Sequence, residues 1–174
     1  MGIQFETDYN METLTAMAKS LRKTVRKKRS RRVHIFAAVV LILGLLTILA
    51  TTAGGEPPGA SGVVTLLAML VVILVSLFED RLNAWFARKR LLPGTEHAVA
   101  TFEEDGYVSA TGVTESRFSY AQIVAVAETA RYFVFALSSH HTQAYDKRTI
   151  RGGSVEDFRA FIAEKTGKLV ENIK

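Results

Sequence analysis

The chain has 174 residues, a formal net charge of +5 and no cysteine. Without cysteine, a disulfide, a thiolate metal site and a cysteine nucleophile are excluded. The charge is unevenly distributed, because residues 91–174 contain nine Lys or Arg against eleven Asp or Glu, a net of −2. The positive excess therefore lies in the N-terminal half, and the basic isoelectric point says little about the C-terminal half.

Residues 1–32 combine a short alternating segment with a basic helix. Ile3 and Phe5 alternate with polar neighbours, which is typical of a strand. A helix is predicted next from apolar residues at helical spacing: Leu14, Met17, Leu21 and Val25. Its other face is basic, so this helix either lies near lipid headgroups or continues directly into the segment that follows.

Two apolar runs, residues 33–53 and 59–78, predict a transmembrane hairpin over residues 33–78. The first run carries no charge unless His34 is protonated, and the second carries none. As a helix the first run would be about 31 Å long, which matches the hydrocarbon core of a bilayer. The glycines and prolines of residues 54–58 favour a turn between the helices. A cleaved signal peptide is excluded, because the first run is too long, begins too late and is followed by a second span.

A dense group of cations precedes the first span: Arg22, Lys23, Arg26, Lys27, Lys28, Arg29, Arg31 and Arg32. Four more cations follow the second span, whereas the loop that contains Glu56 has none. Because cations in short flanks stay on the cytoplasmic side, we predict that both termini are cytoplasmic and that the loop is external. A nucleic-acid-binding arm is the alternative, but the run has no interleaved aromatic residues for base stacking. We therefore expect the bilayer as partner, with anionic headgroups attracted to the cations, and no nucleic acid.

Helical spacing continues past the second span through residues 79–94, where Pro93 and Gly94 end a juxtamembrane helix. Trp85 lies on this extension. It suits an interfacial anchor, because an indole is stable at the membrane–water boundary, or it packs against the C-terminal domain instead.

Residues 95–174 predict a compact α+β domain. Alternating segments HAVATF and YVSATG are joined through EEDG, and further strand-like runs are SRFSY, QIVAVAET, YFVFALS and TQAY. Residues 132–137 are apolar on both faces, as in a central strand covered on each side. A helix follows, with Ser154 and Asp157 as a capping box and Gly167 as its end. We expect an antiparallel sheet closed by one C-terminal helix, with the N-terminal strand paired to a sheet edge.

The pattern FSYAQIVAVAETARYFVFALS, followed by YDKRTI and a helix beginning SVEDFRAFI, resembles the YcxB-like family. The resemblance covers about residues 100–166 closely. It implies a small two-span protein of a bacterial inner membrane, with a cytoplasmic domain of pleckstrin-homology-like organisation. Asp146 departs from the family pattern, which often has proline before the Lys-Arg pair. The family supplies no catalytic residues to carry over.

The chain offers little for catalysis. His140 and His141 suggest a metal site with Glu128, but adjacent strand residues point to opposite faces, so a polar loop is the simpler interpretation. No nucleophile elbow or phosphate loop is present in the sequence. We expect no enzyme activity, no metal and no cofactor.

One cationic group suggests an anion or headgroup contact. Lys147, Arg148 and Arg151 precede Gly152 and Gly153 at the start of the predicted helix, where backbone N–H groups attract anions. A turn that requires glycine explains the same residues.

Two functional classes follow from these features. The first is a non-catalytic membrane protein whose cytoplasmic domain binds a protein, a peptide or a headgroup at the inner surface. By analogy with other small anchored proteins, this class includes protection against membrane-active peptides. The second is an accessory subunit that packs beside a larger transporter or membrane enzyme. The sequence indicates neither the partner's identity nor the oligomeric state.

Overall fold

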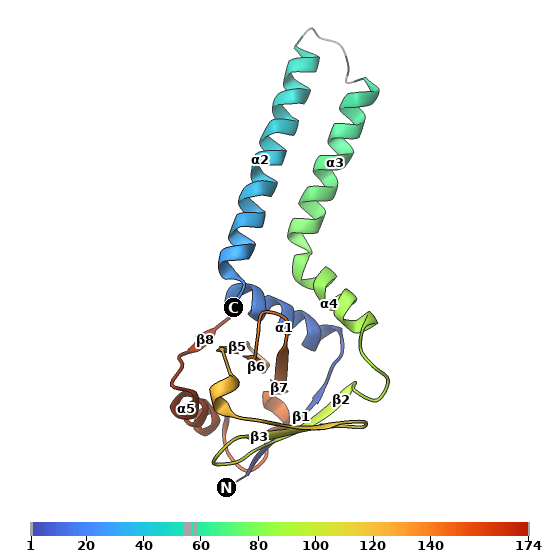
Figure 1. Ribbon diagram of the computed structural model, residues 1–174. Helices are drawn as coiled ribbons and strands as arrows, with labels where there is room; N and C mark the ends of the chain where they lie inside the picture. Colours follow the sequence, from blue (N-terminus) through green and yellow to red (C-terminus); the bar gives the residue numbers. More distant parts are fainter. Residues whose placement is uncertain (1, 54–56, 58, 174) are drawn as a thin grey trace.

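The structure, a computed structural model, describes residues 2–53, 57 and 59–173 (Figure 1). Glu56, in the loop predicted to be external, lies outside the described residues. The elements are β1 (Ile3–Asp8), α1 (Met11–Lys23), α2 (Lys27–Thr52), α3 (Ala60–Leu77), α4 (Glu79–Lys89), β2 (His97–Phe102), β3 (Tyr107–Thr111), β4 (Glu115–Phe118), η1 (Tyr120–Gln122), β5 (Ala125–Glu128), β6 (Tyr132–Ala136), β7 (Thr142–Asp146), η2 (Lys147–Thr149), α5 (Val155–Thr166) and β8 (Val170–Asn172).

The two apolar runs form α2 and α3, which extend side by side away from the rest of the chain (Figure 1). They contain 26 and 18 residues, and an 18-residue window in each has a mean hydropathy of 2.7 and 2.6, so both are long and apolar enough to span a membrane. Helix α2 begins at Lys27 and includes the basic residues before Val33, because none of them interrupts a helix. Gly44 allows close packing, since a Cβ there would lie 2.8 Å from Met69 Sδ.

Helix α1 is separate from the first span. The chain leaves helical geometry at Thr24, and α2 starts three residues later. Of the two alternatives for this segment, the helix that continues directly into the first span is therefore wrong. Leu14 and Leu21 are buried. Helix α1 lies across the base of the hairpin, in contact with α4, β6 and β7 (Figure 1). The packing of the apolar face of α1, which includes Leu14 and Leu21, against the domain therefore determines where α1 lies.

The strands form two four-stranded sheets, ordered β1-β2-β3-β4 and β7-β6-β5-β8. The prediction of one antiparallel sheet needs correction in two respects: there are two sheets, and β8 pairs with β5 in parallel. The predicted pairing of the N-terminal strand is confirmed, because β1 runs antiparallel to β2 from Ile3 opposite Phe102 to Asp8 opposite His97. The folded unit thus comprises the N-terminal strand as well as the predicted domain of residues 95–174.

The pairing of β1 with β2 constrains the membrane topology. The hairpin α2–α3 lies between these two strands in sequence, whereas the strands themselves are hydrogen-bonded neighbours in one sheet. Both ends of the hairpin therefore return to the same folded domain, and both must lie on the same side of a membrane that the hairpin crosses.

The core between the sheets is aromatic. Phe5, Phe102, Phe133 and Phe158 are fully buried, and the Phe158 ring lies 4.6 Å from Phe5 and 4.8 Å from Phe102 between centroids. A second cluster lies on the other face of the β5–β6–β7 sheet, where Tyr132 and Val134 pack near residues of α1. Strand β6 is therefore covered on both faces, which explains its continuous apolar sequence.

Helix α5 begins with the predicted capping box of Ser154 and Asp157 and ends at Gly167, whose φ of +62° is left-handed. Phe158 and Ile162 enter the aromatic core from this helix. Helix α5 is not the last element, because β8 follows it and joins the second sheet.

Candidate functional site

The structure places the three cations of the predicted anion site in separate ion pairs. Lys147 Nζ lies 2.9 Å from Glu128 Oε1, and Arg148 Nη2 lies 3.0 Å from Asp146 Oδ2. Arg151 Nη2 lies 3.1 Å from Glu6 Oε1. The backbone of Arg151 bonds to that of Gln4, near the end of β1 that is farthest from the hairpin (Figure 1). Each of these cations therefore has a carboxylate partner within the domain, and the three do not form one free patch.

The neighbouring glycine has a structural explanation. Gly152 has a φ of +83°, and a Cβ there would lie 2.5 Å from the carbonyl oxygen of Gly2. A residue with a side chain would clash with β1 at this point, so the turn requires glycine.

Glu128 and Asp146 are the buried acids of the domain, 5% and 4% exposed. The carboxylate of Glu128 accepts from Arg159 Nε at 2.7 Å and from Lys147 Nζ at 2.9 Å. The hydrogen bond from Arg159 lowers the pKa of Glu128, and the bond from Lys147 adds to this effect. Asp146 accepts from Arg131 and, as the N-cap of η2, from the backbone N–H of Arg148. Glu128 thus connects β5 to α5 and η2, and Asp146 connects the end of β7 to the β5–β6 turn and η2.

An open pocket of about 660 Å³ lies between α1, the β5–β6 turn and β8, and Arg81 of α4 also lines it. We call it the α1 pocket. Its charged lining residues are Glu12, Lys19, Arg81 and Arg131. Its apolar lining includes Met11, Ala16 and Ile173.

The cations of the α1 pocket are not equivalent. Arg131 is held in place by two acids, since Nη2 lies 2.7 Å from Asp146 Oδ2 and Nη1 pairs with Glu12. Lys19 and Arg81, in contrast, form no hydrogen bond or ion pair within residues 2–53, 57 and 59–173. Elsewhere in the domain the cations are mostly paired, as in Arg117 with Glu103 and Lys165 with Glu104. The α1 pocket therefore presents two available positive charges.

A partly buried ion pair fixes the position of these two charges. Arg22 Nε and Nη2 donate to the two oxygens of Asp80, each at 2.7 Å, and this contact joins α1 to α4. The hydrogen bond to Asp80 raises the pKa of Arg22. Lys19 precedes Arg22 by one helical turn, and Arg81 follows Asp80 directly. The ion pair of Arg22 with Asp80 therefore holds Lys19 and Arg81 near each other.

The remaining cations of the basic run have two roles. Arg26 Nε donates to the carbonyl of Ser139 at 2.6 Å, which connects the start of α2 to the β6–β7 loop. Others lie exposed on the first turns of α2 and form no ion pair within the described part of the chain: Lys27, Lys28, Arg29, Arg31 and Arg32. Lys23 is also exposed. This arrangement leaves most of the run free to face lipid headgroups.

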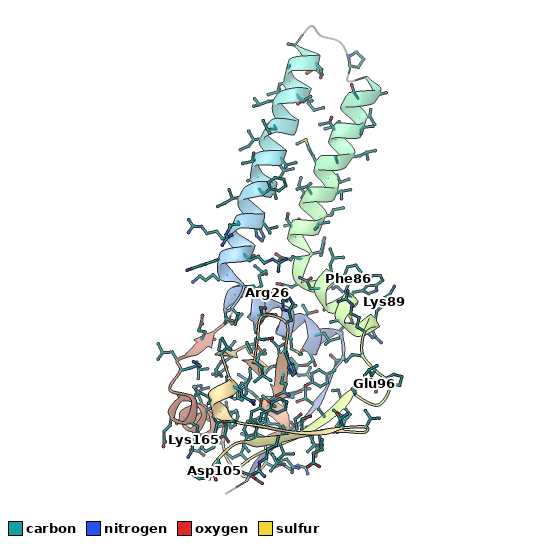
Figure 2. All side chains as sticks on the ribbon, viewed as in Figure 1. Arg26, Phe86, Lys89, Glu96, Asp105 and Lys165 are labelled. Carbon is teal, nitrogen blue, oxygen red and sulfur yellow. The ribbon has the colours of Figure 1, made fainter. Side chains whose placement is uncertain are left out.

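Helix α4 presents two aromatic side chains where the hairpin meets the domain. Trp85 is 44% exposed and Phe86 is 52% exposed, and Lys89 Nζ lies 3.7 Å from the centroid of the Trp85 ring. In Figure 2, Arg26, Phe86 and Lys89 lie at this junction, whereas Asp105 and Lys165 lie toward the opposite end of the domain. An exposed aromatic and cationic surface at this position is suited to the membrane interface.

The histidines do not form a metal site. His140 and His141 lie in the loop between β6 and β7, where His140 Nδ1 is 2.7 Å from Ser139 Oγ. Over residues 2–53, 57 and 59–173 there is no group of three His, Cys, Asp or Glu that could hold a metal ion.

The sequence does not predict that Lys19 and Arg81 lie together. The two residues are 62 positions apart, with both long apolar helices between them in the chain. The one sequence signal for the α1 pocket is the helical spacing of Glu12, Ala16 and Lys19, which places these three residues on one face of α1.

Comparison with known proteins found one family. Residues 102–162 match the model of the family described as YcxB-like protein. No curated protein and no solved structure matches the chain. The matched segment runs from the end of β2 into α5 and includes the buried strand β6, but not the hairpin or β1. The resemblance noted in the sequence is therefore confirmed, and residues 102–162 are the part of the chain that matches the YcxB-like protein family.

Proposed function

We propose that the protein is a non-catalytic binding module anchored in a bacterial inner membrane, with both termini in the cytoplasm. The observation that carries this proposal is the α1 pocket at the base of the hairpin, where Lys19 and Arg81 pair with no acid among the residues that the structure describes. Unpaired cations that line a pocket together favour an anionic partner. The exposed cations on α2 support the cytoplasmic orientation of the same surface.

The domain supports this role as a rigid scaffold. We propose a pleckstrin-homology-like organisation, with two sheets around one aromatic core and α5 closing one side. Burial of Phe158 and Ile162 in that core supports it. Strand β1 and helix α1, on one flank of the hairpin, pack with β2 and α4 on the other. The module is therefore held at a fixed height and orientation instead of hanging on a flexible linker.

Site-directed photo-cross-linking in membranes tests the proposal. A photoreactive phenylalanine at Ala130, which lines the α1 pocket, is expected to capture a ligand. The matched control carries the same probe at Val124, which is 50% exposed and lies outside this pocket. The adduct at position 130 should disappear when Lys19→Glu and Arg81→Glu are combined. An adduct that survives this charge reversal, or equal labelling from position 124, contradicts the proposal.

The same method separates the accessory-subunit alternative. Phe36 is 70% exposed on the lipid-facing surface of α2. A stoichiometric polytopic partner captured from position 36, with no capture from position 130, would replace the binding-module proposal with the accessory-subunit one.

A further inference from the structure

We infer that the ligand of the α1 pocket is an anionic phospholipid of the adjoining leaflet, whose phosphate lies between Lys19 and Arg81. The inference rests on the proposed function of the pocket and specifies its ligand. It assigns these two residues as the phosphate contacts.

The charge of the pocket fits one phosphate diester. Glu12, the acid among the lining residues, pairs with Arg131, and Asp146 behind the lining pairs with Arg131 as well. Neither acid neutralises Lys19 or Arg81. A guanidinium can donate two parallel hydrogen bonds to a phosphate, and an ammonium adds a compact second charge. A zwitterionic headgroup would place its own cation near these residues and lose part of the attraction, so an anionic lipid is preferred.

The depth of the two cations fits the headgroup layer. The second span ends at Leu77, and Arg81 follows four residues later on the first turn of α4. Four residues of a straight helix advance about 6 Å, and α4 turns away from α3 at Phe78, so Arg81 lies no more than about 6 Å beyond the span (Figure 1). The polar layer of a bilayer extends about 5–8 Å beyond the hydrocarbon core on each side. Arg81 therefore lies at the level of lipid phosphates, and the ion pair of Arg22 with Asp80 keeps Lys19 beside it.

The rest of the lining is suited to a lipid better than to a soluble anion. Met11, Ala16 and Ile173 give the pocket an apolar wall, which favours the methylene groups next to a lipid phosphate. The amide of Asn172 forms no side-chain hydrogen bond within the described part of the chain and is available to a headgroup hydroxyl. A free phosphate would use the charges but not the apolar wall.

Native mass spectrometry of the full-length protein in detergent micelles tests the inference. Phosphatidylglycerol, phosphatidylcholine with the same acyl chains, and soluble glycerol 3-phosphate are the three probes. The wild type is expected to retain one phosphatidylglycerol, in preference to phosphatidylcholine. Combining Lys19→Gln with Arg81→Gln should lower the phosphatidylglycerol affinity about 25-fold, which is about fivefold for each cation.

The matched control combines Lys28→Gln with Arg32→Gln, which removes the same charge from exposed positions outside the pocket. Its affinity should stay within about twofold of wild type. Equal losses in the two double variants would overturn the inference, because they would indicate diffuse attraction to the basic surface. Displacement of the lipid by an equal concentration of glycerol 3-phosphate would also overturn it, in favour of a free phosphate ligand.

Failure of the inference can be separated from failure of the proposed function. If the probe at Ala130 captures a peptide, and this capture depends on Lys19 and Arg81, the binding module stands and the lipid assignment is wrong. If position 130 captures nothing and no lipid is retained, both are wrong.

Discussion

Replacing Phe5 by alanine tests whether the N-terminal strand is part of the domain that follows the hairpin. The Phe5 ring is fully buried and lies 4.6 Å from Phe158 and 5.8 Å from both Phe102 and Tyr145 between centroids. Truncating a core phenylalanine to alanine costs about 3–5 kcal/mol. Since a domain of this size is stable by about 5–15 kcal/mol, the variant loses a large part of its stability.

The assay is pulse proteolysis of the full-length protein in lipid nanodiscs over a urea series. With an m value of about 1.5 kcal/mol per molar urea, the expected loss lowers the unfolding midpoint by about 2–3 M. The matched control is Gln4→Ala on the same strand, because Gln4 is partly exposed and its pairing with Arg151 uses backbone atoms only. It should change the midpoint by less than about 0.5 M. Equal midpoints for Phe5→Ala and wild type would refute the assignment of β1 to the core.

Three further predictions concern charge and the interface. The pKa of Glu128 is lowered in the folded state, so its contribution to stability is present above the carboxyl's ordinary pKa and is lost as the pH falls through the folded value. On acidification, the urea midpoint of Glu128→Gln should therefore drop less steeply than that of the wild type. Parallel curves for the two proteins would contradict this prediction. Asp80→Asn should lower the free energy of unfolding by about 1–3 kcal/mol, because it breaks the bidentate contact with Arg22. Asp105→Asn, at an exposed position, is the neutral control. Equal urea midpoints for Asp80→Asn and the wild type would contradict this prediction. Trp85 is the only tryptophan, so its fluorescence should be quenched more by lipids brominated near the headgroup than at the chain ends, and the reverse order would contradict an interfacial position.

Much of the fold could be predicted because its signals are local. Charge-free runs identify the spans, alternation around Phe5 identifies β1, and the Ser154 capping box locates the start of α5. The continuous apolar sequence of β6 even indicates that it is covered on both faces. In each case the residues that decide the structure are close neighbours in the chain.

The features that could not be predicted depend on distant contacts. Strand β8 has three residues, and its parallel pairing with β5 is not encoded by a local turn. The break between α1 and α2 has no glycine or proline to mark it. The sequence pattern predicts an anion site at Lys147 and its neighbours, because it does not show that these cations meet acids such as Glu128 from elsewhere in the chain. The α1 pocket itself depends on the packing of α1 against α4, across two membrane spans.

The proposed orientation in the membrane rests on two independent features, and they make different predictions. The cations of α2 bias which side the hairpin ends occupy. The pairing of β1 with β2 does not choose a side, but requires both ends to share one. A reporter that is active only outside the cytoplasm should therefore be active when inserted at Pro57 and inactive when fused to the C-terminus.

Neutralising the exposed cations separates these two features. Changing five of them to glutamine removes charge without breaking an ion pair of the described residues: Lys27, Lys28, Arg29, Arg31 and Arg32. Arg22 and Arg26 stay, because they bind Asp80 and Ser139. The weakened bias should let some molecules invert, so activity at Pro57 falls while activity at the C-terminus rises by a corresponding fraction. Molecules with only one span inserted would place β1 and β2 on opposite sides and could not form the aromatic core. If single-span molecules nevertheless kept the protease resistance that depends on Phe5, the constraint derived from strand pairing would be wrong.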